Sequence, residues 1–170
     1  CACLVGSEMC IRDSLYMALK YENDMKSYQL WEPSLKTKEP EAIAKACIRL
    51  QDEIDFWVYI QFLFFKQWNA LKKYANQKGI QIIGDLPIYV AEDSADAWAC
   101  HEILQLDENR TPIAVAGCPP DYFAEKGQLW GNPLYDWKKL KETGYRWWIQ
   151  RIRAALSMVD ILRIDHFLSL

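Results

Sequence analysis

Residues 159–167 read VDILRIDHF, a short apolar run followed at once by Arg163, Asp165 and His166. The run predicts a strand over Val159 to Ile164. Alternate residues of a strand share a face, so Arg163 and Asp165 should point to the same side. In a barrel of parallel strands, the C-terminal strand ends carry the chemistry. The segment therefore indicates both a strand and a candidate site at its end.

Helical and strand-like segments alternate upstream of this stretch. One helical face runs from about Asp55 to Lys78, and a second amphipathic helix leads into the terminal strand. Their apolar positions are Trp57, Ile60, Phe64, Trp68, Leu71 and Ala75 for the first, and Tyr145, Trp148, Ile149, Ile152 and Leu156 for the second. Between them, Ile80 to Gly84 predicts a buried strand that ends at Asp85. This order is typical of parallel β/α units.

Composition excludes several classes of function. The 170 residues fit one domain, and a net charge of -3 gives no argument for a nucleic acid or membrane partner. Six scattered cysteines favour a reduced, cytoplasmic protein over a disulfide framework. Only two histidines are present, so we expect no metal and no cofactor. The oligomeric state is left open.

The first 13 residues show neither helical nor strand periodicity, and they do not begin with Met. They lack the basic and apolar regions of a signal peptide. We therefore expect residues 1–13 to be a non-native or disordered leader, and residues 14–170 to form the functional part.

Arg163, Asp165 and His166 form the first candidate constellation. On pattern alone, a structural ion pair at the strand end is the better interpretation. The functional alternative makes Asp165 a nucleophile, which Arg163 would keep ionised by lowering its pKa. Asp85 has the same two interpretations, a turn residue before Pro87 or a polar contact to substrate.

The stretch from Asp85 to Thr143 contains no long periodic element, which predicts a functional loop. Its segment 127–135 reads GQLWGNPLY and includes Trp130 and Asn132. Small and turn-forming residues flank Trp130, so its ring should project. It either fills a gap in the core or offers a flat stacking surface to a sugar ring.

Seven motifs together resemble the amylomaltases, the 4-α-glucanotransferases of glycoside hydrolase family 77. They are SLYMALK (14–20), FLFFKQW (62–68), IIGDLPIYVAEDSADAW (82–98), VAGCPPDYF (115–123), GQLWGNPLYDW (127–137), GYRWW (144–148) and LRIDHF (162–167). The resemblance implies the central part of a (β/α)8 TIM barrel of the α-amylase clan with helical insertions, truncated at both ends.

The same resemblance implies transfer of 1,4-α-glucan segments between maltooligosaccharides by a retaining double displacement. Asp165 would be the catalytic nucleophile and Arg163 its catalytic neighbour. His166, Asp85, Trp130 and Asn132 would bind substrate. The family's acid/base is a glutamate on the next strand, which this chain lacks, so we expect the isolated chain to be inactive. Two alternatives stay open: an α-amylase-clan hydrolase, and a non-catalytic glucan-binding barrel.

Overall fold

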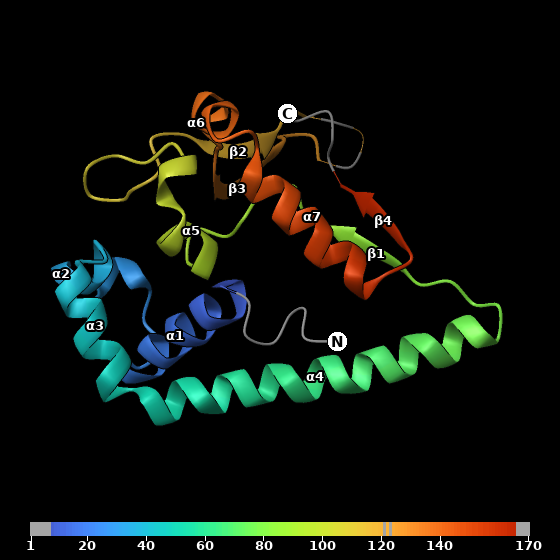
Figure 1. Ribbon diagram of the computed structural model, residues 1–170. Coiled ribbons are helices and arrows are strands. Elements are labelled where there is room, and N and C mark those ends of the chain that lie inside the picture. Colours follow the sequence, from blue (N-terminus) through green and yellow to red (C-terminus); the bar gives the residue numbers. More distant parts are fainter. Residues whose placement is uncertain (1–7, 121, 123, 166–170) are drawn as a thin grey trace. The chain divides into compact units, whose positions relative to one another are not determined.

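The computed structural model describes residues 8–120, 122 and 124–165 (Figure 1). The chain divides into two compact units, Cys1–Ile80 and Gln81–Leu170, which are described separately below. No helix in the described part of the chain is long and apolar enough to span a membrane.

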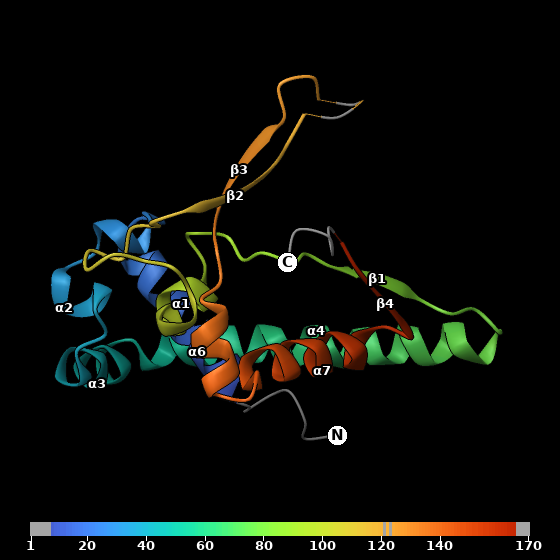
Figure 2. The same ribbon diagram turned by 90° about the horizontal axis from the view of Figure 1, so that it is seen from above.

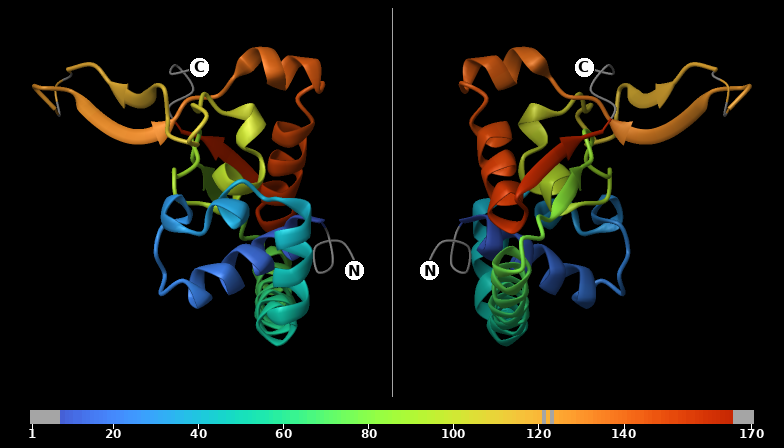
Figure 3. Two further views of the ribbon diagram at one scale, coloured as in Figure 1. Left: turned by 90° about the vertical axis from the view of Figure 1, so that its left-hand side faces the viewer. Right: turned by 90° about the vertical axis from the view of Figure 1, so that its right-hand side faces the viewer.

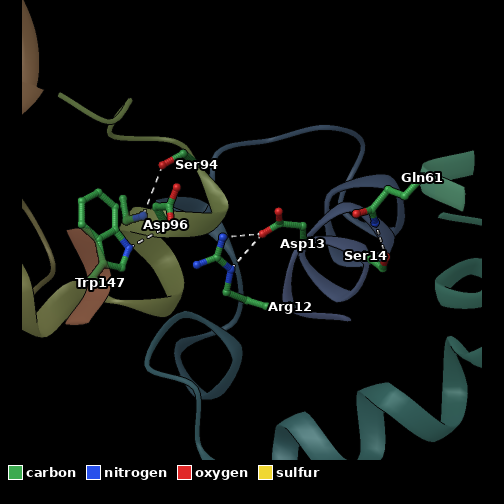
Figure 4. A network of polar contacts seen from close by, with 8 residues as sticks. Arg12, Asp13, Ser14, Gln61, Ser94, Asp96 and Trp147 are labelled. Carbon is green, nitrogen blue, oxygen red and sulfur yellow. Dashed lines mark hydrogen bonds and ion pairs between the residues drawn. The ribbon is translucent and has the colours of Figure 1, made fainter. Parts of the chain in front are cut away.

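The first unit is helical. Its elements are α1 (Glu8–Glu22), η1 (Tyr28–Leu30), α2 (Pro33–Lys36), α3 (Pro40–Arg49) and α4 (Gln51–Gln77). Proline opens both α2 and α3, where its missing N–H is not needed. Helix α1 packs along α4, and the side chain of Gln61 donates a 2.7 Å hydrogen bond to the buried Ser14 hydroxyl between them (Figure 4).

Residues 8–13, which we expected in a leader, lie in α1, so the disordered interpretation fails for them; their origin stays a prediction. The same helix continues through Leu15, Ala18 and Leu19, which are buried, so the packing of its second half accounts for a helix that residues 8–13 do not indicate by themselves.

The long helix expected near 55–78 is confirmed as α4, with slightly different bounds. Gly79 follows it with φ +76°, the left-handed conformation expected of a C-terminal cap, and its N–H bonds the carbonyl of Asn76. Much of the predicted apolar stripe is exposed, however, including Phe64 at 50% and Leu71 at 54%. The periodicity therefore identified the helix but not a face buried within this unit.

The second unit is mixed α/β. Its elements are β1 (Ile83–Leu86), α5 (Ala95–Ala99), η2 (His101–Ile103), β2 (Val115–Cys118), β3 (Gln128–Pro133), α6 (Trp137–Glu142), α7 (Arg146–Met158) and β4 (Ile161–Ile164). Strands β1 and β4 pair in parallel and lie side by side (Figure 3). Strands β2 and β3 form an antiparallel hairpin that extends away from α6 (Figure 2).

The hairpin corrects our expectation of a loop without regular structure between Asp85 and Thr143. Both strands are short, β2 contains glycine and β3 contains glycine and proline, so they lack the β-branched alternation that marks a strand in sequence. Gly117 allows the close pairing, because an added Cβ would collide with the backbone oxygen of Gln128. A register shift between Val115 and Gly117 further weakens the local pattern.

Strand β1 is aligned with β4 by the residues just before β4. The Asp160 carboxylate accepts a 2.8 Å hydrogen bond from the Ile82 N–H, and the Asp160 N–H bonds back to the Ile82 carbonyl at 2.9 Å. A Cβ added at Gly84 would lie 2.6 Å from Cγ1 of Val159, so this approach requires glycine. These contacts shift the strand from the predicted 80–84 to Ile83–Leu86.

The predicted β/α units agree with two observations. The second unit is mixed α/β, and β4, which follows helix α7, pairs in parallel with β1. The parallel sheet contains two strands, β1 and β4, and the described residues close no barrel.

Candidate active site

The carboxyl ends of β1 and β4 bring together two charged side chains that are 78 residues apart in sequence. Asp85 and Arg163 occupy opposite positions in the parallel register, so their side chains lie on the same face. Arg163 donates two hydrogen bonds to the carboxylate, Nε to Oδ1 at 2.7 Å and Nη2 to Oδ2 at 2.5 Å. This bidentate geometry fixes both planar groups.

The pair alters the ionisation of both partners. Hydrogen bonds from Arg163 lower the pKa of Asp85 below its ordinary value, against a small opposing effect of burial. The bonds to Asp85 raise the pKa of Arg163, and the charge of Asp165 acts in the same direction. Both side chains are about half exposed, 65% for Arg163 and 49% for Asp85, so solvent screens the interaction.

Asp165 lies one residue beyond β4 and is exposed. Its backbone N–H is 3.4 Å from the Leu86 carbonyl, which continues the β1–β4 ladder past the strand ends. The sequence pattern suggested that Arg163 would pair with Asp165, but its two side-chain hydrogen bonds go to Asp85. His166, the remaining predicted member of this cluster, lies outside the described residues.

Trp130 and Asn132 lie on β3 rather than on an irregular loop. Trp130 is half-buried; its indole N–H bonds Oε1 of Gln128 at 2.9 Å, and its ring centroid is 6.3 Å from that of Tyr89. The amide of Asn132 donates a 2.8 Å hydrogen bond to the Val90 carbonyl. Both residues therefore contact the segment 87–90, which follows β1 directly.

The sequence interpretation missed the residues that hold segment 87–90 in place. Tyr135 is 1% exposed, and its hydroxyl donates a 2.8 Å hydrogen bond to the Ile88 carbonyl. Arg151 on α7 donates to the Pro87 carbonyl at 2.7 Å and to the Tyr135 hydroxyl at 2.9 Å. A clue was available: Arg151 interrupts the apolar face of a helix between Trp148 and Ile152.

A second polar contact joins α5 to α7. The indole N–H of Trp147 lies 3.2 Å from Oδ1 of Asp96, and the Ser94 hydroxyl caps α5 by accepting from the Ala97 N–H (Figure 4). Within the described residues, no group of three or more His, Cys, Asp or Glu side chains is placed to hold a metal ion.

The carboxyl ends of β1 and β4 thus carry a carboxylate, Asp85, and a guanidinium, Arg163. The segment that follows β1 carries Tyr89, whose ring contacts Trp130. Carboxylates and aromatic faces are the groups that act on and bind sugar rings. The structure thus brings Asp85, Arg163 and Asp165 together, and it links Trp130 and Asn132 to the segment that follows Asp85.

The chain is similar in sequence and in structure to proteins of known activity. The model of glycoside hydrolase family 77, described as 4-alpha-glucanotransferase, matches residues 6–170. The 4-alpha-glucanotransferase of Clostridium butyricum is 49% identical over 91% of this chain and 32% of its own length; that of Synechocystis is 48% identical over 97% and 33%. The chain spans about a third of the length of these relatives.

Solved structures give the same result. An amylomaltase from Streptococcus agalactiae in complex with acarbose matches with a TM-score of 0.90 and 43% identity, covering 98% of this chain and 34% of that one. An amylomaltase from Corynebacterium glutamicum matches with a TM-score of 0.71 and 25% identity, covering 96% and 20%.

Proposed function

The chain belongs to glycoside hydrolase family 77, the 4-alpha-glucanotransferases, and from this premise we propose that the protein carrying it transfers 1,4-α-glucan segments between maltooligosaccharides. The observation that carries the proposal is the parallel strand pair whose carboxyl ends hold Asp85, Arg163 and Asp165. We propose a cytoplasmic location for it as well, consistent with its scattered cysteines.

We propose that β1 and β4 are neighbouring strands of a (β/α)8 barrel. Their parallel pairing and the helix α7 that precedes β4 are the elements of a β/α unit. Ile83, 65% exposed, and Ile161, 43% exposed, share the face of Asp85 and Arg163. Apolar side chains on that face suit a barrel interior, which layers of side chains from all strands fill.

In the proposed reaction, the Asp165 carboxylate attacks the anomeric carbon of the donor, and the bond to the leaving glucan oxygen breaks. That oxygen takes a proton from an acid, which the family resemblance assigns to a glutamate after the next strand. The 4-hydroxyl of an acceptor then attacks the glycosyl ester, returns its proton to that group and releases Asp165. Two displacements retain the anomeric configuration.

Arg163 would serve both carboxylates. Its bidentate bonds hold the Asp85 carboxylate at the strand ends, and its positive charge interacts with that of Asp165, the proposed nucleophile. Asp85, His166, Trp130 and Asn132 would contact the sugar. For Asn132 the carbonyl oxygen and the second amide hydrogen are the groups left for such a contact, because the bond to Val90 uses one of the two hydrogens on its nitrogen.

The test uses an assembled enzyme, in which this chain replaces the matching segment of the Streptococcus agalactiae amylomaltase. The close structural match allows the junctions to be placed residue by residue. Incubated with maltotriose, a transferase gives glucose and longer maltooligosaccharides. Glucose and maltose alone would indicate the hydrolase alternative. A folded assembled enzyme that binds maltotriose without converting it would show that this segment lacks a working nucleophile, because the acid/base comes from the Streptococcus agalactiae protein.

A further inference from the structure

Segment 87–90 connects the charged strand ends to the aromatic residues of the site, yet it belongs to no helix or strand. Three of its backbone carbonyls are held by side chains instead. Arg151 binds the carbonyl of Pro87, Tyr135 binds that of Ile88, and Asn132 binds that of Val90. The path of the segment therefore depends on side-chain donors and not on a backbone ladder.

Arg151 is the centre of this arrangement. Its Nη2 lies 2.7 Å from the Pro87 oxygen, and its Nη1 lies 2.9 Å from the Tyr135 hydroxyl and 3.5 Å from the Ile88 oxygen. The guanidinium also lies over the rings of Trp147 and Trp148, 5.1 and 5.3 Å from their centroids. A planar fork with several donors can meet all of these groups at once, whereas a lysine ammonium cannot.

Tyr135 transmits this constraint to the aromatic surface. Burial raises the pKa of Tyr135, so its hydroxyl stays protonated and can accept from Arg151 while donating to Ile88. Its ring stacks on Tyr89 with centroids 6.0 Å apart and planes 17° apart, and Tyr89 in turn contacts Trp130. Arg151, Tyr135, Tyr89 and Trp130 thus form one contiguous series of contacts.

We propose that Arg151 is a positioning residue of the transferase site, acting through Tyr135 and segment 87–90. Together they set the distance between the carboxylates at the strand ends and the stacking surface of Tyr89 and Trp130. This inference rests on the proposed function. Its consequence is that a loose segment 87–90 slows the glycosyl transfer step and admits water, without a comparable loss of substrate binding.

Two variants separate positioning from packing. Tyr135→Phe keeps the stacked ring but removes the hydroxyl that links Arg151 to Ile88. Arg151→Lys keeps the positive charge but removes the planar fork. Arg153→Lys, an exposed change two residues further along α7, is the matched control.

The first measurement is hydrogen exchange of the 170-residue chain, followed by mass spectrometry. We expect the amides of the peptide that spans β1, which is paired with β4, and segment 87–90 to exchange at least about tenfold faster in both variants than in the wild type and in Arg153→Lys. Unchanged exchange in these amides would overturn the proposal, because the segment would then be held without Arg151 and Tyr135.

The second measurement is maltotriose disproportionation by the assembled enzyme carrying the same variants. We expect kcat to fall about tenfold, KM to change less than about twofold, and the ratio of transfer to hydrolysis to fall. Variants that melt at a lower temperature but keep the wild-type kcat and transfer ratio would show a purely structural role and overturn the proposal. A wild-type assembled enzyme without transfer would count against the proposed function instead, and hydrogen exchange would still decide whether Arg151 holds the segment.

Discussion

Asp85 and Arg163 form a bidentate ion pair across β1 and β4, although 78 residues separate them in sequence. The pair can form only when the two strands lie in their parallel register. The ion pair therefore forms only when the chain between β1 and β4 is folded so that the two strands lie next to each other. The same register places Asp165 one residue beyond β4, next to Leu86 at the end of β1.

The Asp85–Arg163 pair should make stability depend on acid pH. Because Arg163 lowers the pKa of Asp85 in the folded state, the stabilisation is present above the unfolded pKa of about 3.9 and is lost as the pH falls through the folded value. We therefore expect the melting temperature of the wild type to exceed that of Asp85→Asn at pH values above about 5, and the difference to vanish in stronger acid. Thermal melts of the 170-residue chain across this range measure it.

The control for this prediction is a double-mutant cycle with Arg163→Gln. In the Arg163→Gln background, Asp85→Asn should no longer change the pH dependence. Because both side chains are exposed, the difference should be small and should shrink in about 1 M salt. A difference that persists at high salt, or in the Arg163→Gln background, would point to a cause other than this pair.

We predict that Trp130→Ala in the assembled enzyme weakens use of the acceptor more than cleavage of the donor. The indole is half-buried and lies beside Tyr89, where one of its faces could stack on a sugar. Loss of an aromatic stacking contact of about 0.5–1.5 kcal/mol corresponds to a rise of about two- to tenfold in the KM for the acceptor. Initial rates with maltotriose as donor and glucose as varied acceptor measure it.

Leu129→Ala is the matched control for Trp130, because Leu129 is the preceding residue of β3 and is 81% exposed. It should leave both half-reactions unchanged. If Trp130→Ala instead lowers the melting temperature and all activities together, the side chain fills the core and the acceptor role is wrong.

Local periodicity explains which elements could be predicted. Helix α4 and the succession of α7 and β4 follow from apolar spacing along 10 or more consecutive residues. The β2–β3 hairpin does not, since it depends on backbone pairing around Gly117 and on residues with weak strand preference. The shift of β1 to Ile83–Leu86 likewise depends on Asp160, 78 residues from its partner Ile82.

In the candidate site, too, local sequence predicts where single residues lie but not which distant residues they contact. Sequence placed Asp85, Arg163 and Asp165 at strand ends, but it suggested a contact between Arg163 and Asp165 within one strand. Alternate residues of a strand are about 6.6 Å apart, whereas neighbouring strands are only about 4.8 Å apart. The guanidinium therefore reaches Asp85 more easily, and only the register between strands reveals it. Arg151 and Tyr135 were missed for a similar reason, because their partners are backbone carbonyls.

The close approach of Gly84 to Val159 predicts a strong effect of Gly84→Ala. The added methyl would lie 2.6 Å from Cγ1 of Val159, whose β-branched side chain has few alternative rotamers. Overpacking of this kind should lower the free energy of unfolding by about 1–3 kcal/mol. Urea denaturation of the 170-residue chain measures the change.

Val159→Ala provides the matched partner for Gly84→Ala. The truncated side chain leaves room for the new methyl, so the double variant should be more stable than the sum of the two single effects predicts. Strictly additive effects would mean that the methyl at position 84 meets some other group.

We predict that Asp165 carries the covalent glycosyl intermediate. It lies just past the carboxyl end of β4, where its carboxylate can attack the anomeric carbon, and its charge interacts with that of Arg163. Asp165→Asn keeps the shape but removes the charge, so kcat of the assembled enzyme should fall by at least about a thousandfold while its melting temperature barely changes. Asp160→Asn is the contrasting variant, because the Asp160 carboxylate accepts a hydrogen bond from the Ile82 N–H. It should lower the melting temperature clearly and leave kcat nearly unchanged. Labelling with a mechanism-based fluorosugar, followed by peptide mass spectrometry, identifies the nucleophile directly, and a label on a peptide without Asp165 would show that the assignment is wrong.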